Sequence, residues 1–338
     1  MIVVLDKGVS LKDKASIVRF IEQNGGRLLV SELGDATHIG LVDSVAQALA
    51  PEIERMPGVG SIRSEAPPYP QVSREHHETG TVVDVRDVPV GGDEVVVMAG
   101  PCSVESAEQI SIVSRGVAGA GARILRGGAF KPRTSPYSFQ GMGEEGLLLL
   151  AAAREESGLP IVTEVVAPED VALVGTHADM LQIGARNMQN FRLLSEVGAQ
   201  PLPVLLKRGI ASSIEEVLLA AEYVVSAGNA RVILCERGIR TFETATRNTF
   251  DVSAVPVLKQ KTHLPVIVDP SHAAGDRSLV PPLAAAGVAA GADGVLVEVH
   301  NDPDNALSDG PQSLTIPAFT EMMGLLKAVA DAVGRSIR

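Results

Sequence analysis

The sequence predicts an α/β protein: a (β/α)8 barrel, the TIM-barrel architecture, preceded by a small ferredoxin-like α+β domain. From residue 95 onward, eight short apolar stretches alternate with stretches of helical spacing, an alternation typical of a parallel barrel. Residues 1–66 follow the order strand, helix, strand, strand, helix, strand, which is that of a ferredoxin-like module. These two observations define the predicted fold class.

The individual elements follow from hydrophobic periodicity. In the N-terminal module we expect strands at 1–5, 27–33, 37–43 and 59–64, and helices at 11–23 and 45–53. The barrel strands are expected at 95–100, 123–127, 161–165, 179–184, 203–207, 231–236, 265–270 and 294–299, and the clearest helices at 108–120, 144–157, 214–227 and 279–290. An open, doubly wound sheet is the alternative. The eightfold count, and the lack of a Gly-x-Gly-x-x-Gly motif after the first strand, favour the barrel.

The domain boundary is expected at the stretch Ala66-Pro67-Pro68-Tyr69-Pro70, because prolines at this density continue neither a helix nor a central strand. A short hairpin, 81–85 with 87–90, follows it. The predicted organisation is therefore a ferredoxin-like domain at 1–66, a linker with hairpin at 67–93, and a barrel at 94–338.

Composition excludes several classes of protein. No apolar run reaches the roughly 20 residues that a membrane helix needs, and we expect neither a signal peptide nor a membrane partner. The net charge of −12 argues against a nucleic-acid partner, which needs a basic surface. The two cysteines favour a reducing, cytoplasmic location over a disulfide scaffold. A local cluster of Arg and Lys in such an acidic chain therefore indicates a small anionic ligand.

Such a cluster is expected at the carboxyl ends of the strands, where barrel enzymes place their chemistry. The cationic residues at or just after predicted strands are Arg126, Lys131, Arg133, Arg186, Lys207, Arg208 and Arg237. Guanidinium and ammonium groups suit phosphate and carboxylate oxygens, and seven of them suggest two anionic substrates, or one with both groups. Ion pairs of some of them with Glu164, Glu236 or Asp269 are the alternative.

A second set of residues lies at the ends of the first, seventh and eighth predicted strands and in the loop after the last one. It combines a thiol, an imidazole and two carboxylates: Cys102, His272, Glu298 and Asp309. This mixture of soft and hard ligands suits one divalent ion such as manganese, iron, zinc or cobalt. Each residue also has a structural explanation as a core thiol, a turn residue or an ion-pair partner, and spacing alone leaves both interpretations open.

Seven motifs make the sequence similar to one family: GPCSVE, RGGAFKPRTSPYSFQG, QIGARNMQNF, LLKRG, ILCERGIRTFE, VDPSH and LSDGPQSL. They resemble the 3-deoxy-D-arabino-heptulosonate 7-phosphate (DAHP) synthases, and within them the type I beta branch that carries an N-terminal ferredoxin-like domain. The resemblance implies a metal-dependent, aldol-type condensation of phosphoenolpyruvate with D-erythrose 4-phosphate and water. This is the first step of the shikimate pathway to the aromatic amino acids.

The resemblance also implies roles for individual residues. Phosphoenolpyruvate would be held by Arg126, Lys131, Arg186, Lys207 and Arg237. The erythrose 4-phosphate side would be lined by Lys131, Pro132, Arg133, Thr134 and Ser135. The metal ligands would be Cys102, His272, Glu298 and Asp309. Lys131, between the two substrates, is the candidate for proton delivery to the aldehyde oxygen, and Glu164 or Asp269 for organising the attacking water.

For the N-terminal module the resemblance implies feedback control by an aromatic amino acid and a homotetramer in which the module closes over a neighbouring barrel. Ser31 and the Gly25-Gly26 turn are candidate effector contacts, whereas Leu29 stands where some relatives have a polar residue. A purely structural cap is the alternative.

Three other functions compete with this one. 3-Deoxy-D-manno-octulosonate 8-phosphate synthase shares the barrel and the first substrate, but it typically has Ala-Asn in place of Pro132-Arg133. A Schiff-base aldolase would use Lys207. A non-catalytic sensor of phosphorylated ligands is the third, and the complete set of basic and ligand positions argues against it.

Overall fold

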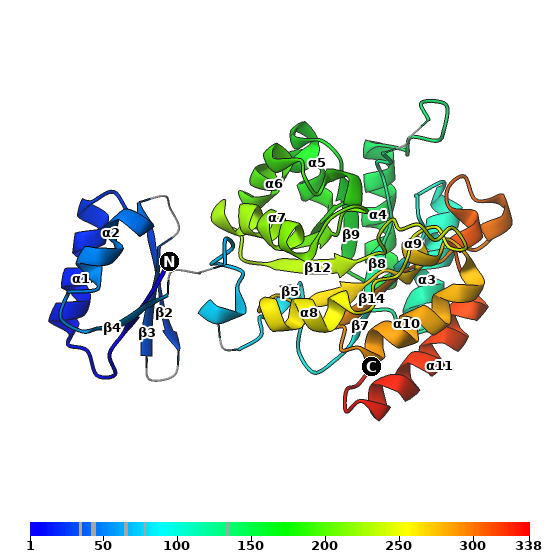
Figure 1. The fold of residues 1–338 in the computed structure, drawn as a ribbon. Helices are drawn as coiled ribbons and strands as arrows, with labels where there is room; N and C mark the ends of the chain where they lie inside the picture. The colour runs from blue at the N-terminus through cyan, green and yellow to red at the C-terminus, as the bar shows by residue number, and fades with distance from the viewer. Residues whose placement is uncertain (34–35, 42–44, 64–66, 78, 133–134) are drawn as a thin grey trace. The chain divides into compact units, whose positions relative to one another are not determined.

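The structure is a computed structural model that describes residues 1–33, 36–41, 45–63, 67–77, 79–132 and 135–338. The chain forms two compact units, Met1–Thr79 with Lys261–His263, and Gly80–Gln260 with Leu264–Arg338. Figure 1 shows the fold of each. Among the described residues, no helix is both long and apolar enough to cross a membrane.

The first unit contains a four-stranded antiparallel sheet with strand order β2-β3-β1-β4. Its elements are β1 (Ile2–Leu5), α1 (Leu11–Gln23), β2 (Leu28–Leu33), β3 (Ala36–Leu41), α2 (Ala46–Ile53) and β4 (Val59–Arg63). Helix α1 begins where the Ser10 hydroxyl accepts a hydrogen bond from the Asp13 N–H. Apolar residues of the sheet and of both helices form one buried cluster. The predicted order of strands and helices is confirmed.

The second unit is a closed, parallel, eight-stranded barrel surrounded by helices (Figure 1). Its strands are β7 (Val96–Gly100), β8 (Ile124–Arg126), β9 (Ile161–Val165), β10 (Met180–Ile183), β11 (Val204–Lys207), β12 (Val232–Glu236), β13 (Val266–Val268) and β14 (Gly294–Glu298). Its helices are α3 (Ala107–Gly119), α4 (Glu144–Ser157), α5 (Val171–His177), α6 (Phe191–Gly198), α7 (Ile214–Ser226), α8 (Ala254–Lys261), α9 (Pro270–Ala274), α10 (Val280–Ala289) and α11 (Ile316–Ala332). Pairing of β14 with β7 closes the ring. The predicted barrel is confirmed.

A hairpin of β5 (Val83–Val85) and β6 (Val88–Val90) lies ahead of the barrel in sequence, as predicted. Its four buried valines belong to one cluster with barrel-interior side chains near the amino ends of the strands, such as Met98 and Met180. The hairpin therefore fills the amino end of the barrel with apolar side chains and leaves the carboxyl end for polar ones.

Candidate active site

A cavity of about 300 Å³ lies at the carboxyl end of the barrel. The residues that line it are Arg126, Lys131, Pro132, Ser135, Ser138, Glu164, Gln182, Gly184, Ala185, Arg186, Lys207, Arg237, Arg247, His272 and Asp309. They converge because parallel strands in a barrel all end on the same side. Every described residue that we predicted to bind substrate is in this wall. Arg133 and Thr134 lie outside the described residues.

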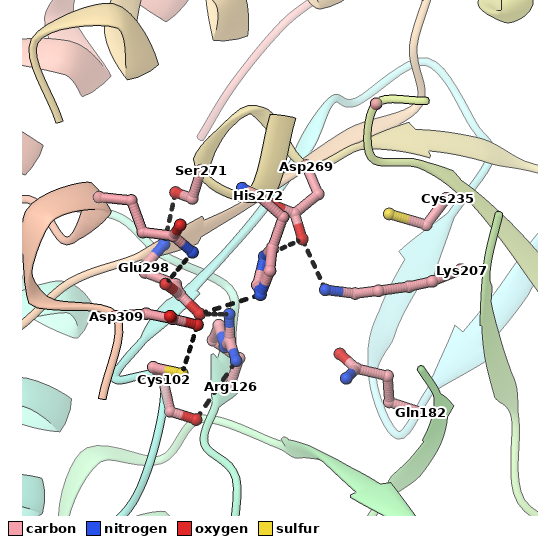
Figure 2. A network of polar contacts seen from close by, with 12 residues as sticks. Cys102, Arg126, Gln182, Lys207, Cys235, Asp269, Ser271, His272, Glu298 and Asp309 are labelled. Carbon is pink, nitrogen blue, oxygen red and sulfur yellow. Dashed lines mark hydrogen bonds and ion pairs between the residues drawn. The ribbon is translucent and has the colours of Figure 1, made fainter. Parts of the chain in front are cut away.

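A compact group of ligand-type side chains borders the cavity (Figure 2). Ligand atoms of Cys102, Glu298 and Asp309 all lie within 4.8 Å of one another. Nε2 of His272 is 3.4 Å from Oε1 of Glu298, and the Cys102 thiol donates to Oδ2 of Asp309 at 3.3 Å. A thiol, an imidazole and two carboxylates thus meet in one place, and this donor set fits a first-row divalent ion.

His272 is oriented by Asp269, which directly follows β13. The Asp269 carboxylate caps helix α9: Oδ1 accepts the His272 N–H at 3.0 Å, and Oδ2 lies 2.7 Å from the imidazole Nδ1. Pro270, in the first turn, fixes the start of the short helix. The carboxylate on Nδ1 turns Nε2 toward Glu298, the arrangement by which proteins orient metal-binding histidines.

The backbone at Cys102 and at Asp309 is held by unusual conformations. A Cβ at Gly100, whose φ is +153°, would lie 2.0 Å from the Arg126 carbonyl oxygen, so only glycine fits where this loop leaves β7. Asp309 has a φ of +49°, uncommon for a residue with a side chain. Its loop is tied back by the Leu307 N–H, which donates to Oε1 of Glu105 at 2.9 Å.

Charges around the group keep its carboxylates anionic. Burial opposes ionisation of Asp309, but His272 and Arg247 outweigh it and lower the pKa of this carboxyl to about 2. Burial likewise opposes ionisation of Glu298, whose pKa is nevertheless lowered by His272 and Arg126. Burial, followed by the Glu298 carboxylate, raises the pKa of the Cys102 thiol to about 12. The two carboxylates, Glu298 and Asp309, would repel one another without a cation, and the nearby Arg126 and His272 reduce this repulsion.

Lys131 lies between the ligand group and the cavity. Its Nζ donates to both the backbone oxygen and the Sγ of Cys102, each at 3.1 Å. Burial lowers the pKa of Lys131, but Cys102 and Glu164 more than compensate, and the net pKa is raised. The carboxylates of Glu164 and Glu298 counteract Arg126, whose charge alone would lower the pKa of Lys131.

Among the buried cationic residues of the cavity wall, some form ion pairs and some have a donor atom without a partner among the described residues. Nη1 of Arg126 lies 2.8 Å from Oε1 of Glu298, and Nζ of Lys207 lies 2.5 Å from Oδ2 of Asp269. In contrast, Nη1 of Arg237 is buried and has no hydrogen-bond partner in the part of the chain that the structure describes. A buried donor without an acceptor is costly, and Arg237 therefore indicates a place for a ligand oxygen.

Arg208 does not face the cavity. Its Nη1 lies 2.8 Å from both Oε2 of Glu236 and Oδ2 of Asp251, and its Nε donates to the Ser212 carbonyl oxygen. Side chains alternate along a strand, so Arg208 points outward where its neighbour Lys207 points inward. The prediction that Arg208 joins the cations at the mouth is wrong, and the alternative of an ion pair with Glu236 is confirmed.

The two candidates for organising water differ in position. Glu164 lines the cavity, and Nε2 of Gln182 approaches its Oε2 at 3.4 Å. The Asp269 carboxylate is fully buried and engaged by Lys207 and His272. Of the two carboxylates, Glu164 therefore reaches the cavity, whereas Asp269 is held between Lys207 and His272.

Among the site residues that were not predicted from the sequence, Arg247 and Gln312 contact the proposed metal ligands. Arg247 lines the cavity from the long loop after β12, eleven residues beyond the end of that strand. Gln312 accepts a hydrogen bond from Arg247 and donates one to Glu298. Arg247 was not predicted because it lies far from the end of a strand. The signal for Gln312 was its place in the motif LSDGPQSL, three residues after Asp309.

A closed barrel, a cavity rich in cations and an adjacent thiol–imidazole–carboxylate group together define a barrel enzyme for small anionic substrates. Known proteins agree with this class. The phospho-2-dehydro-3-deoxyheptonate aldolase of Thermotoga maritima is 48% identical over 334 residues, which cover 99% of each chain. The crystal structure of a phospho-2-dehydro-3-deoxyheptonate aldolase (DAHP synthase) from Thermotoga maritima matches with a TM-score of 0.80 and 47% identity, covering 100% of this chain and 99% of that one.

The family model described as the DAHP synthetase I family matches residues 72–334. This chain belongs to that family, and the resemblance seen in the motifs is confirmed. A more distant relative, the 2-dehydro-3-deoxyphosphooctonate aldolase of Syntrophobacter fumaroxidans, is 33% identical over 267 residues, which cover 72% of this chain and 92% of that protein.

Proposed function

We propose that this chain is an enzyme that condenses phosphoenolpyruvate with D-erythrose 4-phosphate and water to give DAHP and inorganic phosphate, the entry reaction of the shikimate pathway. The observation that supports this most is the 48% identity, over 99% of both chains, to a phospho-2-dehydro-3-deoxyheptonate aldolase. The phosphooctonate aldolase matches at lower identity and covers 72% of this chain. The polar cavity, with cations on several walls, suits two phosphorylated substrates.

In this proposal Arg126, Arg186, Lys207 and Arg237 hold the phosphate and carboxylate of phosphoenolpyruvate, assisted by Lys131. The unsatisfied Nη1 of Arg237 supports this assignment, since a bound anion would supply its acceptor. Lys131, Pro132, Arg133, Thr134 and Ser135 form the erythrose 4-phosphate side. Because Lys131 to Ser135 all follow within nine residues of the end of β8, the segment after that strand would contact both substrates and align their reacting carbons.

Cys102, His272, Glu298 and Asp309 would hold one divalent ion, such as manganese, iron, zinc or cobalt. The fit is supported by the proximity and mixed chemistry of the four donors and by the Asp269 contact that orients His272. When bound, such an ion supplies Lewis-acid polarisation of the aldehyde carbonyl.

The chain's own residues then account for the proton movements. Carbon 3 of the enol attacks the aldehyde carbon, and the Lys131 ammonium gives a proton to the aldehyde oxygen as the bond forms. Water adds at carbon 2, oriented by Glu164, which lies in the cavity wall. One proton of that water passes to the Glu164 carboxylate. The hydroxyl left on carbon 2 gives its proton to the departing phosphate as the bond between carbon 2 and the phosphate oxygen breaks, which leaves a ketone at carbon 2 and inorganic phosphate.

Acceptor preference tests the proposed function. We expect steady turnover with erythrose 4-phosphate and a kcat/KM with arabinose 5-phosphate lower by about 100-fold or more, because a longer sugar misplaces its phosphate. Phosphate release with each acceptor, measured side by side on the same preparation, gives this ratio. A ratio near one or reversed would contradict the assignment and favour the phosphooctonate reaction.

A Schiff-base mechanism at Lys207 can be tested on the same material. The Lys207 ammonium lies 2.5 Å from Asp269, an ion pair that leaves no lone pair free for attack on a carbonyl. Borohydride reduction in the presence of substrate should therefore leave the protein unmodified by mass.

We further propose that the first unit binds an aromatic amino acid and inhibits the barrel within a homotetramer. Ser31 supports an effector site, because its hydroxyl is buried and has no hydrogen-bond partner among the described residues. The Gly25-Gly26 turn is a second candidate contact; Gly25 has a φ of +79°. Leu29 leaves the choice between tyrosine and phenylalanine open. The cytoplasmic location stays a prediction.

Truncation tests this regulation. We expect a protein that starts at Gln71 to keep its turnover and to lose inhibition by tyrosine or phenylalanine, because the proposed binding residues are removed. Initial rates over a range of each amino acid, for the full chain and the truncated one, measure the effect. Equal inhibition of both proteins would assign the first unit a structural role only.

A further inference from the structure

Gln312 is a buried glutamine that spans two residues of the site. It is 2% exposed, its Nε2 donates to Oε2 of Glu298 at 2.6 Å, and its Oε1 accepts from Nη1 of Arg247 at 2.7 Å. A carboxylate can only accept and a guanidinium can only donate. The two neighbours therefore fix the amide in one orientation, because a flipped amide would place its oxygen against Glu298 and its NH2 group against Arg247.

With the contact from Gln312, both oxygens of the Glu298 carboxylate are held by hydrogen-bond donors. Oε1 of this fully buried carboxylate lies 2.8 Å from Nη1 of Arg126, and Oε2 is held by Gln312. The Glu298 N–H donates to the Ser271 hydroxyl at 3.0 Å. Both carboxylate oxygens and the main chain thus have partners, which sets the plane of the carboxylate before any ligand arrives.

The other end of Gln312 is connected through Arg247 to the end of helix α9. The Arg247 N–H donates to the Ala274 carbonyl oxygen at 3.0 Å, at the end of the helix that carries His272. A Cβ at Gly275 would lie 2.5 Å from Cβ of Arg247, so the two segments are in close contact. Nη1 of Arg247 also lies 3.4 Å from Oδ1 of Asp309. Arg247 therefore connects Gln312 to two of the other proposed metal ligands.

We propose that Gln312 is a positioning residue for the divalent metal ion: it presets the carboxylate of Glu298 and, through Arg247, ties that carboxylate to Asp309 and the His272 helix. The proposal rests on the metal site of the proposed function. Gln312 is outside the set of described residues that line the cavity, so it acts through Glu298 and not on substrate. Outer contacts of this kind typically tune metal affinity by about 10–100-fold.

The test is cobalt binding to metal-free protein, followed by the visible absorption of the cobalt ion. We expect Gln312→Met, which keeps the size of the side chain but loses both hydrogen bonds, to weaken binding by about 10–100-fold and to change the spectrum. Gln312→Glu keeps the acceptor for Arg247 but opposes Glu298 with a second carboxylate, so a comparable loss is expected. Gln260→Met, at an exposed position of α8, is the matched control and should match the unaltered protein.

Two further measurements separate positioning from stability and from the metal site itself. The unfolding midpoint of the metal-free Gln312→Met protein should fall, because two buried hydrogen bonds are lost, but the fall in cobalt affinity should exceed the one that this loss of stability explains. Unchanged cobalt affinity, or a loss that only follows an equal fall in metal-free stability, would overturn the role of Gln312. If Cys102→Ser binds cobalt as the unaltered protein does, the metal site of the proposed function fails, and the positioning role falls with it.

Discussion

Replacing Lys131 with methionine will lower kcat by about 10²–10⁴-fold, the range that a lost general acid removes, and will leave metal binding intact. Its Nζ lies 3.1 Å from both Sγ and the backbone oxygen of Cys102, and its side chain also lines the cavity. In the proposed reaction the aldehyde oxygen would lie next to Cys102, Glu298 and Asp309, within reach of the Lys131 ammonium. Methionine has a similar length, so the wall of the cavity is kept and the proton is lost.

The measurement is steady-state kinetics with both substrates together with metal content after dialysis. If Lys131 delivers the proton, kcat falls more than the KM of phosphoenolpyruvate rises. Lys131→Arg, which retains a positive charge but hardly donates its proton, should recover the KM and not the kcat. Near-normal turnover of Lys131→Met would exclude the role.

The fold could be predicted because strong local patterns determine it, whereas the ligand set was predicted from the resemblance of the motifs, since spacing alone left the metal interpretation open. Fully apolar strands such as Val232–Glu236 belong to parallel sheets buried on both faces, and all eight strands end on the same side. A residue that ends a strand is thereby placed at the mouth, whatever its distance in sequence. This is why Cys102, just after β7, and Glu298, at the end of β14, could be expected close together. Asp309 lies eleven residues beyond the end of β14, and the motif LSDGPQSL placed it with them.

What could not be predicted depends on side-chain direction just beyond the strands. Lys207 and Arg208 are neighbours of equal charge, but one lines the cavity and the other pairs with Glu236. The two-residue alternation of a strand separates them, and the sequence alone does not tell at which residue that alternation stops. The direction of the Asp269 side chain was also not predictable, because a carboxylate at the end of a strand can face either water or a helix N-terminus. Helix α9 begins directly after Asp269, and the carboxylate caps it.

Arg247 shows a second reason. It reaches the cavity from a loop of irregular structure whose path is set by contacts with α9, such as the Asn248 side-chain amide that donates to the His272 carbonyl oxygen at 2.9 Å. Contacts between segments that far apart leave no periodic signal. Loop residues of this kind carry much of the function of barrel enzymes, and here the structure had to supply them.

Replacing Cys102 with serine will abolish tight metal binding and reduce turnover to background. A hydroxyl is a poor, neutral ligand, whereas a thiolate is an anionic, soft one that favours zinc, iron or cobalt. Loss of a direct ligand should exceed the about 10–100-fold expected for an outer contact such as Gln312. Metal content after dialysis and activity with added manganese measure the two consequences.

The second cysteine provides a matched control for this variant. Cys235 is also buried, at 1% exposure, but lies on β12 beside Lys207 and away from the ligand group (Figure 2). Cys235→Ala should therefore keep both metal and activity. Removing the metal from the unaltered protein with a chelator should lower its activity as much as Cys102→Ser does. Added manganese should then restore the unaltered protein, which still has the Cys102 thiol, and should not restore Cys102→Ser. Full activity of Cys102→Ser after chelation would mean that the barrel performs its chemistry with cationic side chains alone, and the thiol would then be a core residue.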